Sequence, residues 1–291
     1  MPLRQTTYIF CLFTCCLLFL GIVGLHAQGS VWGTGAVTKK AGKGISDSKK
    51  KLKDYKKQLQ EWGMDNNYTH ELLLGGKVNS NGWSGAVQYL TKQDKKTNTL
   101  WQFSFSEIKH DKQIKITGTN NANPQLGNNG PFIFGKINNL YALQLGWGKE
   151  KILLPGLLDG DISVSLRYNG GFSLAMLKPY YLKLVYTDAN NVTYLEQQKY
   201  SESNSEKFLN SGSILSASAW SKGLDEIDYV PGAYIESCVV IQPGKNKSFI
   251  QVVTLGINAA FYAKDLPIMA DQKAYPYQAS LFAGIGLGKR W

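Results

Sequence analysis

The sequence is poor in the residues that most catalytic and metal sites require. It contains three histidines and four cysteines among 291 residues. Cys11, Cys15 and Cys16 lie in an apolar stretch at the N-terminus, and only Cys238 lies further along the chain. One cysteine excludes an internal disulfide and a cysteine-based metal cluster in that remainder. We therefore expect neither a metal ion nor another cofactor.

Charge and long apolar runs are also scarce. Only 18% of the residues are charged, and the mean hydropathy is −0.22. A bundle of transmembrane helices would need several runs of about 20 apolar residues, which these values exclude. Glycine, with 30 residues, and aromatic residues, at 12%, are abundant instead.

The first 27 residues have the pattern of a secretory signal peptide. Arg4 supplies a positive charge, Tyr8 to Leu25 is apolar, and Ala27 is a small residue at the expected cleavage position. The alternative is an uncleaved membrane anchor, since the apolar run is just long enough to span a bilayer.

Residues 28–68 carry most of the excess positive charge. Nine lysines and two aspartates lie between residues 39 and 57, a net charge of +7. Leu52, Tyr55, Leu59 and Trp62 recur at near-helical spacing, so we expect a basic amphipathic segment that forms a short helix in the periplasm, ahead of the barrel. Its basic face comprises Lys49, Lys50, Lys53, Lys56 and Lys57. This face suits anionic lipid, a polyanion or an acidic partner protein; the alternative is a solvated helix that docks on its own domain.

From residue 69 to residue 291, apolar and polar residues alternate with a period of two. In "TLWQFSFSEI", Trp101, Phe103 and Phe105 alternate with Gln102 and Ser104. This pattern predicts β-strands. Eight such runs occur, at residues 70–78, 82–90, 99–108, 138–149, 161–186, 232–241, 248–262 and 275–291.

The polar row of these strands is unusual for a protein surrounded by water. It consists mainly of Gly, Ser, Ala, Gln and Asn, which suit the crowded interior of a narrow barrel. The other row places aromatic residues near strand ends, as at a membrane interface: Trp83, Trp101, Trp147 and Trp291. We therefore predict an all-β fold, an antiparallel up-and-down transmembrane β-barrel of eight strands. A soluble β-domain is the alternative, and "QIKIT" and "PFIFGKI" within 107–137 leave ten strands open.

The connections alternate in length, as they do in such barrels. If Trp291 lies at the periplasmic side, the connections at 91–98, 150–160 and 242–248 are inner turns. The outer connections are then "NSNG", 110–137, 186–230 and 263–274. The 186–230 segment is long, and its "GSILSASAWSKGLDEIDYVPG" stretch predicts either a short helix over the barrel mouth or a variable surface loop.

Several charged residues fall on the predicted interior face. They are Glu71, Lys77, Arg167 and Glu236, accompanied by Asn169. Unpaired charges in a narrow barrel are costly, so we expect these residues to pair and to close the lumen. The alternative is a polar pathway or a ligand site.

Little in the sequence points to catalysis. "GWGKEK" and "GIGLGKR" lack the spacing of a phosphate-binding loop. His110 with Ser106 is the one pair that suggests a base and a nucleophile. We do not expect an enzyme.

The Ala27-Gln28 site, the eight alternating strands and the closing "GIGLGKRW" together resemble outer-membrane β-barrel proteins of the Bacteroidota type. The resemblance covers residues 69–291 and implies an outer-membrane location in a Gram-negative bacterium, with the N-terminal segment in the periplasm. The small barrel also resembles accessory barrels of envelope machines such as type IX secretion.

We therefore expect a structural or interaction component of the bacterial envelope. Its partners would be outer-membrane lipid and envelope proteins, reached through the basic segment or the 186–230 loop, and not nucleic acid. The alternatives are a barrel that binds or transports a small apolar ligand, and a lipid-modifying outer-membrane enzyme.

Overall fold

The computed structural model describes residues 68–94, 96–117, 129–155, 162–190, 192–242 and 249–291. The chain divides into two units, Met1–Lys57 and Gln58–Trp291, and only the second contains described residues. The expected signal peptide at 1–27 and the basic face from Lys49 to Lys57 lie outside the described residues.

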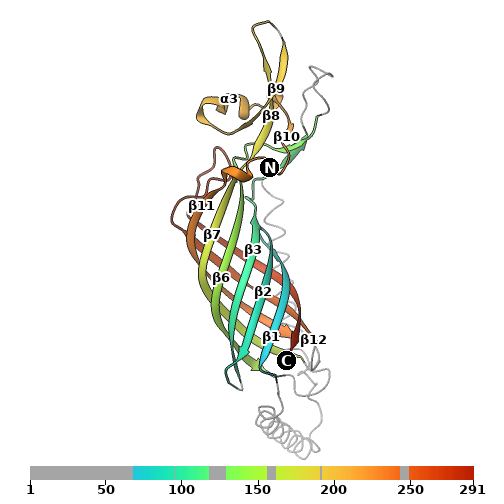
Figure 1. Cartoon of the computed structure of the whole chain (residues 1–291), viewed down its shortest axis with the longest axis vertical. Helices are drawn as coiled ribbons and strands as arrows, with labels where there is room; N and C mark the ends of the chain where they lie inside the picture. Colours follow the sequence, from blue (N-terminus) through green and yellow to red (C-terminus); the bar gives the residue numbers. More distant parts are fainter. Residues whose placement is uncertain (1–67, 95, 118–128, 156–161, 191, 243–248) are drawn as a thin grey trace, which may run out of the picture. The chain divides into compact units, whose positions relative to one another are not determined.

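Eight antiparallel strands form a closed barrel in the order β1-β13-β12-β11-β7-β6-β3-β2 (Figure 1). They are β1 (His70–Asn79), β2 (Gly82–Lys92), β3 (Thr97–Ile108), β6 (Asn138–Leu154), β7 (Ser163–Pro179), β11 (Asp228–Gln242), β12 (Phe249–Tyr262) and β13 (Tyr277–Arg290). Consecutive barrel strands are neighbours, and β13 pairs with β1 from Glu71↔Arg290 to Asn79↔Phe282. The prediction of an eight-stranded up-and-down barrel is confirmed.

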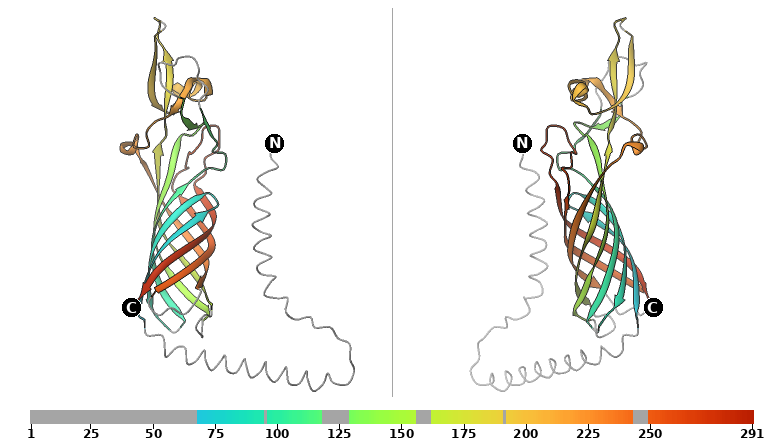
Figure 2. Two further views of the ribbon diagram at one scale, coloured as in Figure 1. Left: turned by 90° about the vertical axis from the view of Figure 1, so that its right-hand side faces the viewer. Right: turned by 60° about the vertical axis from the view of Figure 1, so that its left-hand side comes forward.

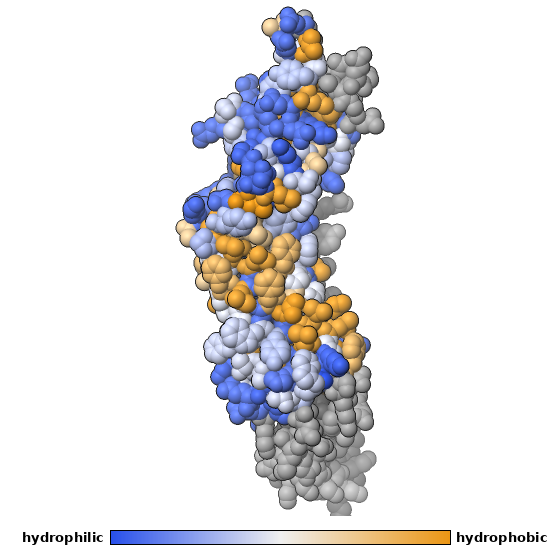
Figure 3. Space-filling model, viewed as in Figure 1, coloured by the Kyte–Doolittle hydropathy of each residue, from blue (hydrophilic) through white to orange (hydrophobic). Residues whose placement is uncertain are grey.

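The alternation in the sequence becomes the two faces of the barrel wall. On β3, Trp101 and Phe103 point outward and are exposed, whereas Gln102 and Ser104 point inward and are buried. Figure 3 shows apolar residues gathered in a band across the visible face of the barrel, with polar residues toward both ends. The strands contain 10 to 17 residues, whereas about 9 to 11 tilted residues suffice to cross a bilayer.

The remaining elements extend from one end of the barrel, which we name the cap end (Figure 2). We call the described residues between β3 and β6 and between β7 and β11 the cap. It contains a hairpin, β4 (Lys115–Thr117) with β5 (Pro131–Ile133), and a sheet of β10 (Ile214–Ala217), β8 (Tyr181–Thr187) and β9 (Thr193–Lys199). Its helical turns are η2 (Glu202–Asn204), α3 (Ser205–Phe208), η3 (Ser211–Ser213) and η4 (Leu224–Glu226).

The cap differs from the sequence expectation in three places. The 161–186 run is not one strand: the chain leaves the barrel after Pro179, and β8 joins the cap sheet. The hairpin β4–β5 pairs only with itself, so the barrel has eight strands and not ten. For "GSILSASAWSKGLDEIDYVPG", where a short helix and a surface loop were the alternatives, the structure has β10, the single helical turn η4 and the start of β11.

The cap has an apolar core of its own. Phe132, Leu182, Leu184, Phe208 and Ile214 are fully buried together. These side chains come from β5, β8, α3 and β10, so the core joins segments from both long connections.

Among the described residues, no helix is long and apolar enough to cross a membrane.

The effect of a charged substitution on the free energy of unfolding tests whether lipid or water surrounds the barrel wall. Leu145 lies outward on β6 between Phe103 and Phe172, and Val192 lies in the cap; the two are 53% and 58% exposed. In lipid vesicles L145R is expected to lower the free energy of unfolding by about 2–4 kcal/mol, because arginine is unfavourable against lipid. V192R is the matched control and is expected to change it by less than about 0.5 kcal/mol. Equal, small effects in chemical denaturation would contradict a lipid-facing wall.

Candidate functional site

Three ion pairs lie in the barrel interior. Lys77 Nζ lies 2.6 Å from Glu236 Oε1, linking β1 to β11. Arg290 Nε lies 2.9 Å from Glu71 Oε2, linking β13 to β1 across the closing seam. The third pair joins β7 to β6 through Arg167. Each pair neutralises charges that would be costly to bury alone.

Arg167 is the most completely buried charged residue in the described part of the chain, at 1% exposure. Its Nη2 and Nε atoms donate to Glu150 Oε2 at 2.6 and 3.0 Å. Its Nη1 donates to Gln88 Oε1, and Ser165 Oγ donates to the other carboxylate oxygen of Glu150 at 2.6 Å. The guanidinium therefore bonds to groups from two strands, Glu150 of β6 and Gln88 of β2.

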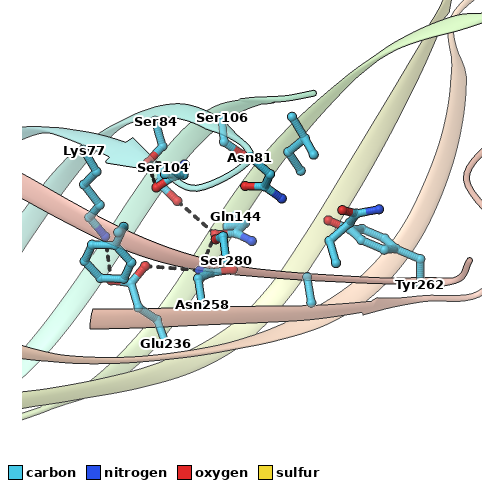
Figure 4. Close-up of a pocket in the computed structure, with 15 residues that line it drawn as sticks. Lys77, Asn81, Ser84, Ser104, Ser106, Gln144, Glu236, Asn258, Tyr262 and Ser280 are labelled. Atoms are coloured by element: carbon cyan, nitrogen blue, oxygen red, sulfur yellow. Dashed lines mark hydrogen bonds and ion pairs between the residues drawn. The ribbon is translucent and has the colours of Figure 1, made fainter. Parts of the chain in front are cut away.

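Amide and hydroxyl groups connect Glu236 to the rest of the interior (Figure 4). Gln102 Nε2 and Asn258 Nδ2 donate to its two carboxylate oxygens at 3.3 and 3.2 Å. Asn258 Nδ2 also lies 3.3 Å from Gln144 Oε1, which accepts from Ser104 Oγ at 3.3 Å. This network ties β3, β6, β11 and β12 together at mid-height.

Four of the five interior residues singled out from the sequence form ion pairs: Lys77 and Glu236 with each other, Glu71 with Arg290 and Arg167 with Glu150. Asn169 lies inside as well, but its side-chain nitrogen and oxygen have no partner among the described residues. The sequence reasoning missed Glu150, the partner of Arg167, because it ended the fourth strand at residue 149. The alternation Gln144, Gly146, Gly148, Glu150 continues inward to that position and was the available signal.

An apolar cluster fills the interior between the Glu71–Arg290 pair and the Lys77–Glu236 pair. Leu73, Leu90, Leu100 and Ile250 are at most 1% exposed, and they pack with further apolar residues of β11, β12 and β13. This part of the lumen is therefore filled by side chains of the wall itself.

A loop fills the lumen at the cap end. The connection between β12 and β13 turns Leu266, Ile268 and Met269 into a buried cluster with inward residues of β3, β6, β7 and β11. Its backbone is fixed by Ile137 N–H donating to Ile268 O at 2.8 Å and by Ala270 N–H donating to Gly135 O at 2.7 Å. We name residues 263–276 the mouth loop.

A small polar cavity remains between the mouth loop and the ion pairs. Its walls include Lys77, Ser106, Glu236, Asn258 and Tyr262, several of which Figure 4 labels. The volume open to the centre of a water molecule is about 30 Å³. A single water needs roughly 10–15 Å³ by that measure, so the cavity has room for on the order of two waters. This cavity is too small to hold a larger molecule.

A second, larger hollow lies outside the barrel, between the cap and the mouth loop. Its volume, measured in the same way, is about 480 Å³. Ile114, Ile116, Phe134, Leu209 and Met269 supply its apolar lining. At its rim Lys112 Nζ donates to Gln272 Oε1 at 2.6 Å. We name it the apolar groove.

Lys136 and Glu226 of the cap have shifted pKa values with clear causes. Burial lowers the pKa of Lys136 to about 8, and its ammonium donates to Gln113 Oε1 at 3.3 Å. Hydrogen bonds from Lys199 and Tyr181 lower the pKa of Glu226, and the Lys199 bond is 2.7 Å long. Lys136 therefore loses its charge in mildly basic solution, while Glu226 stays ionised at neutral pH.

The pair considered for catalysis does not come together. Ser106 Oγ points into the barrel and donates to Ala142 O at 3.4 Å. His110 lies beyond the end of β3, and its Nδ1 accepts from Lys112 N–H at 3.2 Å. The described residues also contain no group of three or more His, Cys, Asp or Glu side chains placed to hold a metal ion.

The four tryptophans expected at the membrane interface all lie on the exterior. Trp101 is directly opposite Trp147 in the β3–β6 register, and both are 52% exposed. Trp291 lies against His70 with ring centroids 6.1 Å apart. Trp83, nearer the cap end, donates from Nε1 to Glu107 Oε2 at 2.6 Å.

The buried pair between Lys77 and Glu236 can be tested by a double-mutant cycle. K77M leaves the Glu236 carboxylate without its cation, and is expected to lower the free energy of unfolding by about 3–5 kcal/mol. K77M/E236L removes both charges and should recover most of that loss. The measurement is reversible denaturation in detergent micelles or vesicles. Additive losses in the double variant would show that the two side chains do not act as a pair.

No protein-family model matches this chain. No curated protein matches it in sequence.

Several solved structures resemble the chain in three dimensions. Ail, the attachment invasion locus protein of Yersinia pestis, is 7% identical with a TM-score of 0.36, over 77% of this chain and 99% of Ail. Neisserial surface protein A is 6% identical with a TM-score of 0.36, over 77% and 97%. A major outer membrane protein from Thermus thermophilus is 8% identical with a TM-score of 0.41, over 77% and 100%. Identities and scores this low carry no argument about function, so the fold rests on the strand pairing described above.

Proposed function

We propose that this protein is an outer-membrane β-barrel that acts as a closed scaffold and presents its cap outside the cell. It would serve as a structural or interaction component of a Gram-negative envelope rather than as a pore or an enzyme. The wall supports a lipid environment because large apolar side chains cover its exterior while charges are paired inside. Water-soluble proteins have the opposite arrangement.

One observation carries the closed-scaffold part of the proposal: side chains fill the lumen along its length. Along β1, the Glu71–Arg290 pair lies nearest the end opposite the cap, the apolar residues around Leu73 come next, and the Lys77–Glu236 pair follows. Leu266, Ile268 and Met269 of the mouth loop occupy the cap end. An eight-stranded barrel has room for side chains and little else. Any role in recognition then falls to surfaces outside the lumen.

The connection lengths support an orientation. At the end opposite the cap, β2 and β3 are joined across residues 93–96, whereas the cap end carries the connections at 109–137 and 180–227. Short turns are typical of the periplasmic side and long loops of the outside. In the proposed orientation β1 begins at the periplasmic end, and we propose a periplasmic location for the basic segment that precedes it in the sequence. The proposed Bacteroidota origin and a role beside a secretion machine rest on the sequence resemblance alone.

The closed lumen predicts that the full protein does not conduct ions. In planar lipid bilayers the wild-type protein is expected to give no steady conductance steps, because its cavity holds only a few waters. A porin inserted under the same conditions is the positive control. A reproducible single-channel conductance that scales with salt concentration would contradict a closed scaffold.

The apolar groove favours a second candidate function, the binding of a small apolar ligand. Ligand sites are usually concave, mostly apolar and about 300–1,000 Å³ in volume. The groove meets these conditions, with about 480 Å³ and five apolar side chains in its lining. Such a site would lie outside the barrel and not in its lumen.

The groove can be tested with a photoactivatable apolar diazirine and mass spectrometry. We expect adducts within residues 112–117 and 269–272 in addition to those on the barrel wall. I116D is expected to abolish them by placing a carboxylate in the groove, whereas V192D, elsewhere in the cap, should not. Adducts confined to the wall, or unchanged adducts in I116D, would remove this second function.

A further inference from the structure

One aromatic residue of the cap is placed against the outer face of the barrel. Trp220 lies between β10 and η4, and 64% of its surface is exposed. Its indole Nε1 donates to Tyr141 Oη at 3.0 Å. Tyr141 belongs to β6 and is on the exterior row of that strand. The loop therefore reaches back to the wall.

The covering of Lys178 shows on which side of the wall this loop lies. Lys178 follows Phe172, Leu174 and Met176 on the outward row of β7, yet it is only 2% exposed. Its Nζ donates to the carbonyl oxygens of Trp220 at 2.6 Å and Lys222 at 3.2 Å. An outward side chain can be buried in this way only because the 220–222 backbone lies over the exterior of the barrel and not over its mouth.

Lys178 also holds the indole ring in place. Its Nζ lies 5.2 Å from the centroid of the Trp220 ring, within the range of a cation–π interaction. Together with the bond to Tyr141, this fixes an exposed tryptophan from two barrel strands. A tryptophan that merely occupied a solvated loop would not need such support.

Trp220 extends a strip of aromatic rings that runs around the wall. Trp83 and Phe105 have ring centroids 5.9 Å apart, and Phe105 and Tyr141 have centroids 5.8 Å apart. Trp220 then bonds to Tyr141. The four rings come from β2, β3, β6 and the loop, so the loop adds one aromatic residue to a series that the strands begin.

The strip continues on the next strands. In the register, Tyr141 of β6 is opposite Met176 of β7, which is opposite Tyr229 of β11. Tyr229 is 55% exposed and Leu224 of η4 is 43% exposed. Figure 1 shows this segment as the orange turn beside the cap-end portions of β7 and β11. Three large, exposed side chains, Trp220, Leu224 and Tyr229, therefore lie in one short segment.

From these contacts we infer that residues 218–229 form a lipid anchor that rests in the headgroup region of the outer leaflet. Tryptophan and tyrosine suit that region, because their rings are apolar and their polar atoms remain hydrogen-bonded. The anchor fastens the base of the cap to the membrane beside the barrel. This inference rests on the proposed function, since it needs a wall that faces lipid.

Spin labels on the full chain in lipid nanodiscs measure this depth. In a C11A/C15A/C16A/C238A background, which leaves no cysteine in the chain, one label each is attached at S221C, L145C and V192C. S221C probes the anchor with Trp220 intact, L145C the middle of the wall, and V192C the solvated cap. Power saturation with oxygen and with a water-soluble nickel complex reports the depth of each label.

The expected depth of the S221C label lies between those of L145C and V192C. Adding W220S should change the depth of the S221C label to that of the V192C label. Adding Y194S, which removes an exposed cap tyrosine, should leave the depth of the S221C label unchanged. An S221C label that matches V192C while L145C lies in lipid would overturn the anchor alone. If L145C itself is exposed to water, the lipid-facing wall fails and the anchor fails with it.

Discussion

The pairing of β13 with β1 is the constraint on which the rest of this structure depends. The first described strand meets the last over nine residue pairs, and backbone bonds between His70 and Trp291 extend the seam. Closure leaves no barrel strand with an unpaired edge, which a bilayer would not tolerate. It also fixes which residues face inward, because a shift of one residue at the seam would turn every side chain of a strand to the other face.

With the faces fixed, the small interior determines what the barrel can do. Arg167, Lys77 and Arg290 each pair with a carboxylate within the lumen. The apolar cluster around Leu73 packs between two of these pairs, and the mouth loop occupies the cap end. The surfaces available for binding therefore lie outside the lumen. They are the wall that contacts lipid, the apolar groove, and the loop that Lys178 fastens to the wall.

The sequence predicted the parts of this architecture that depend on local pattern. The period-two alternation located all eight barrel strands and put Glu71, Lys77, Arg167 and Glu236 inside, since a strand's faces follow from residue parity alone. It did not predict contacts made by irregular backbone. Leu266, Ile268 and Met269 enter the mouth through a loop with no periodicity, and Lys178 is buried by a segment about 40 residues further along the chain. Nor did it show that the chain leaves the barrel after Pro179, because the alternation continues through β8.

The most direct test of this account is whether the barrel wall touches acyl chains. Trp101 and Trp147 face each other on the exterior of β3 and β6. The fluorescence lost in W101F/W147F isolates their contribution to the emission of the full protein. In vesicles this component should be quenched strongly by lipids brominated on their acyl chains and weakly by iodide in the water. Strong quenching by iodide with none by brominated lipid would contradict a barrel whose wall contacts the acyl chains of the membrane.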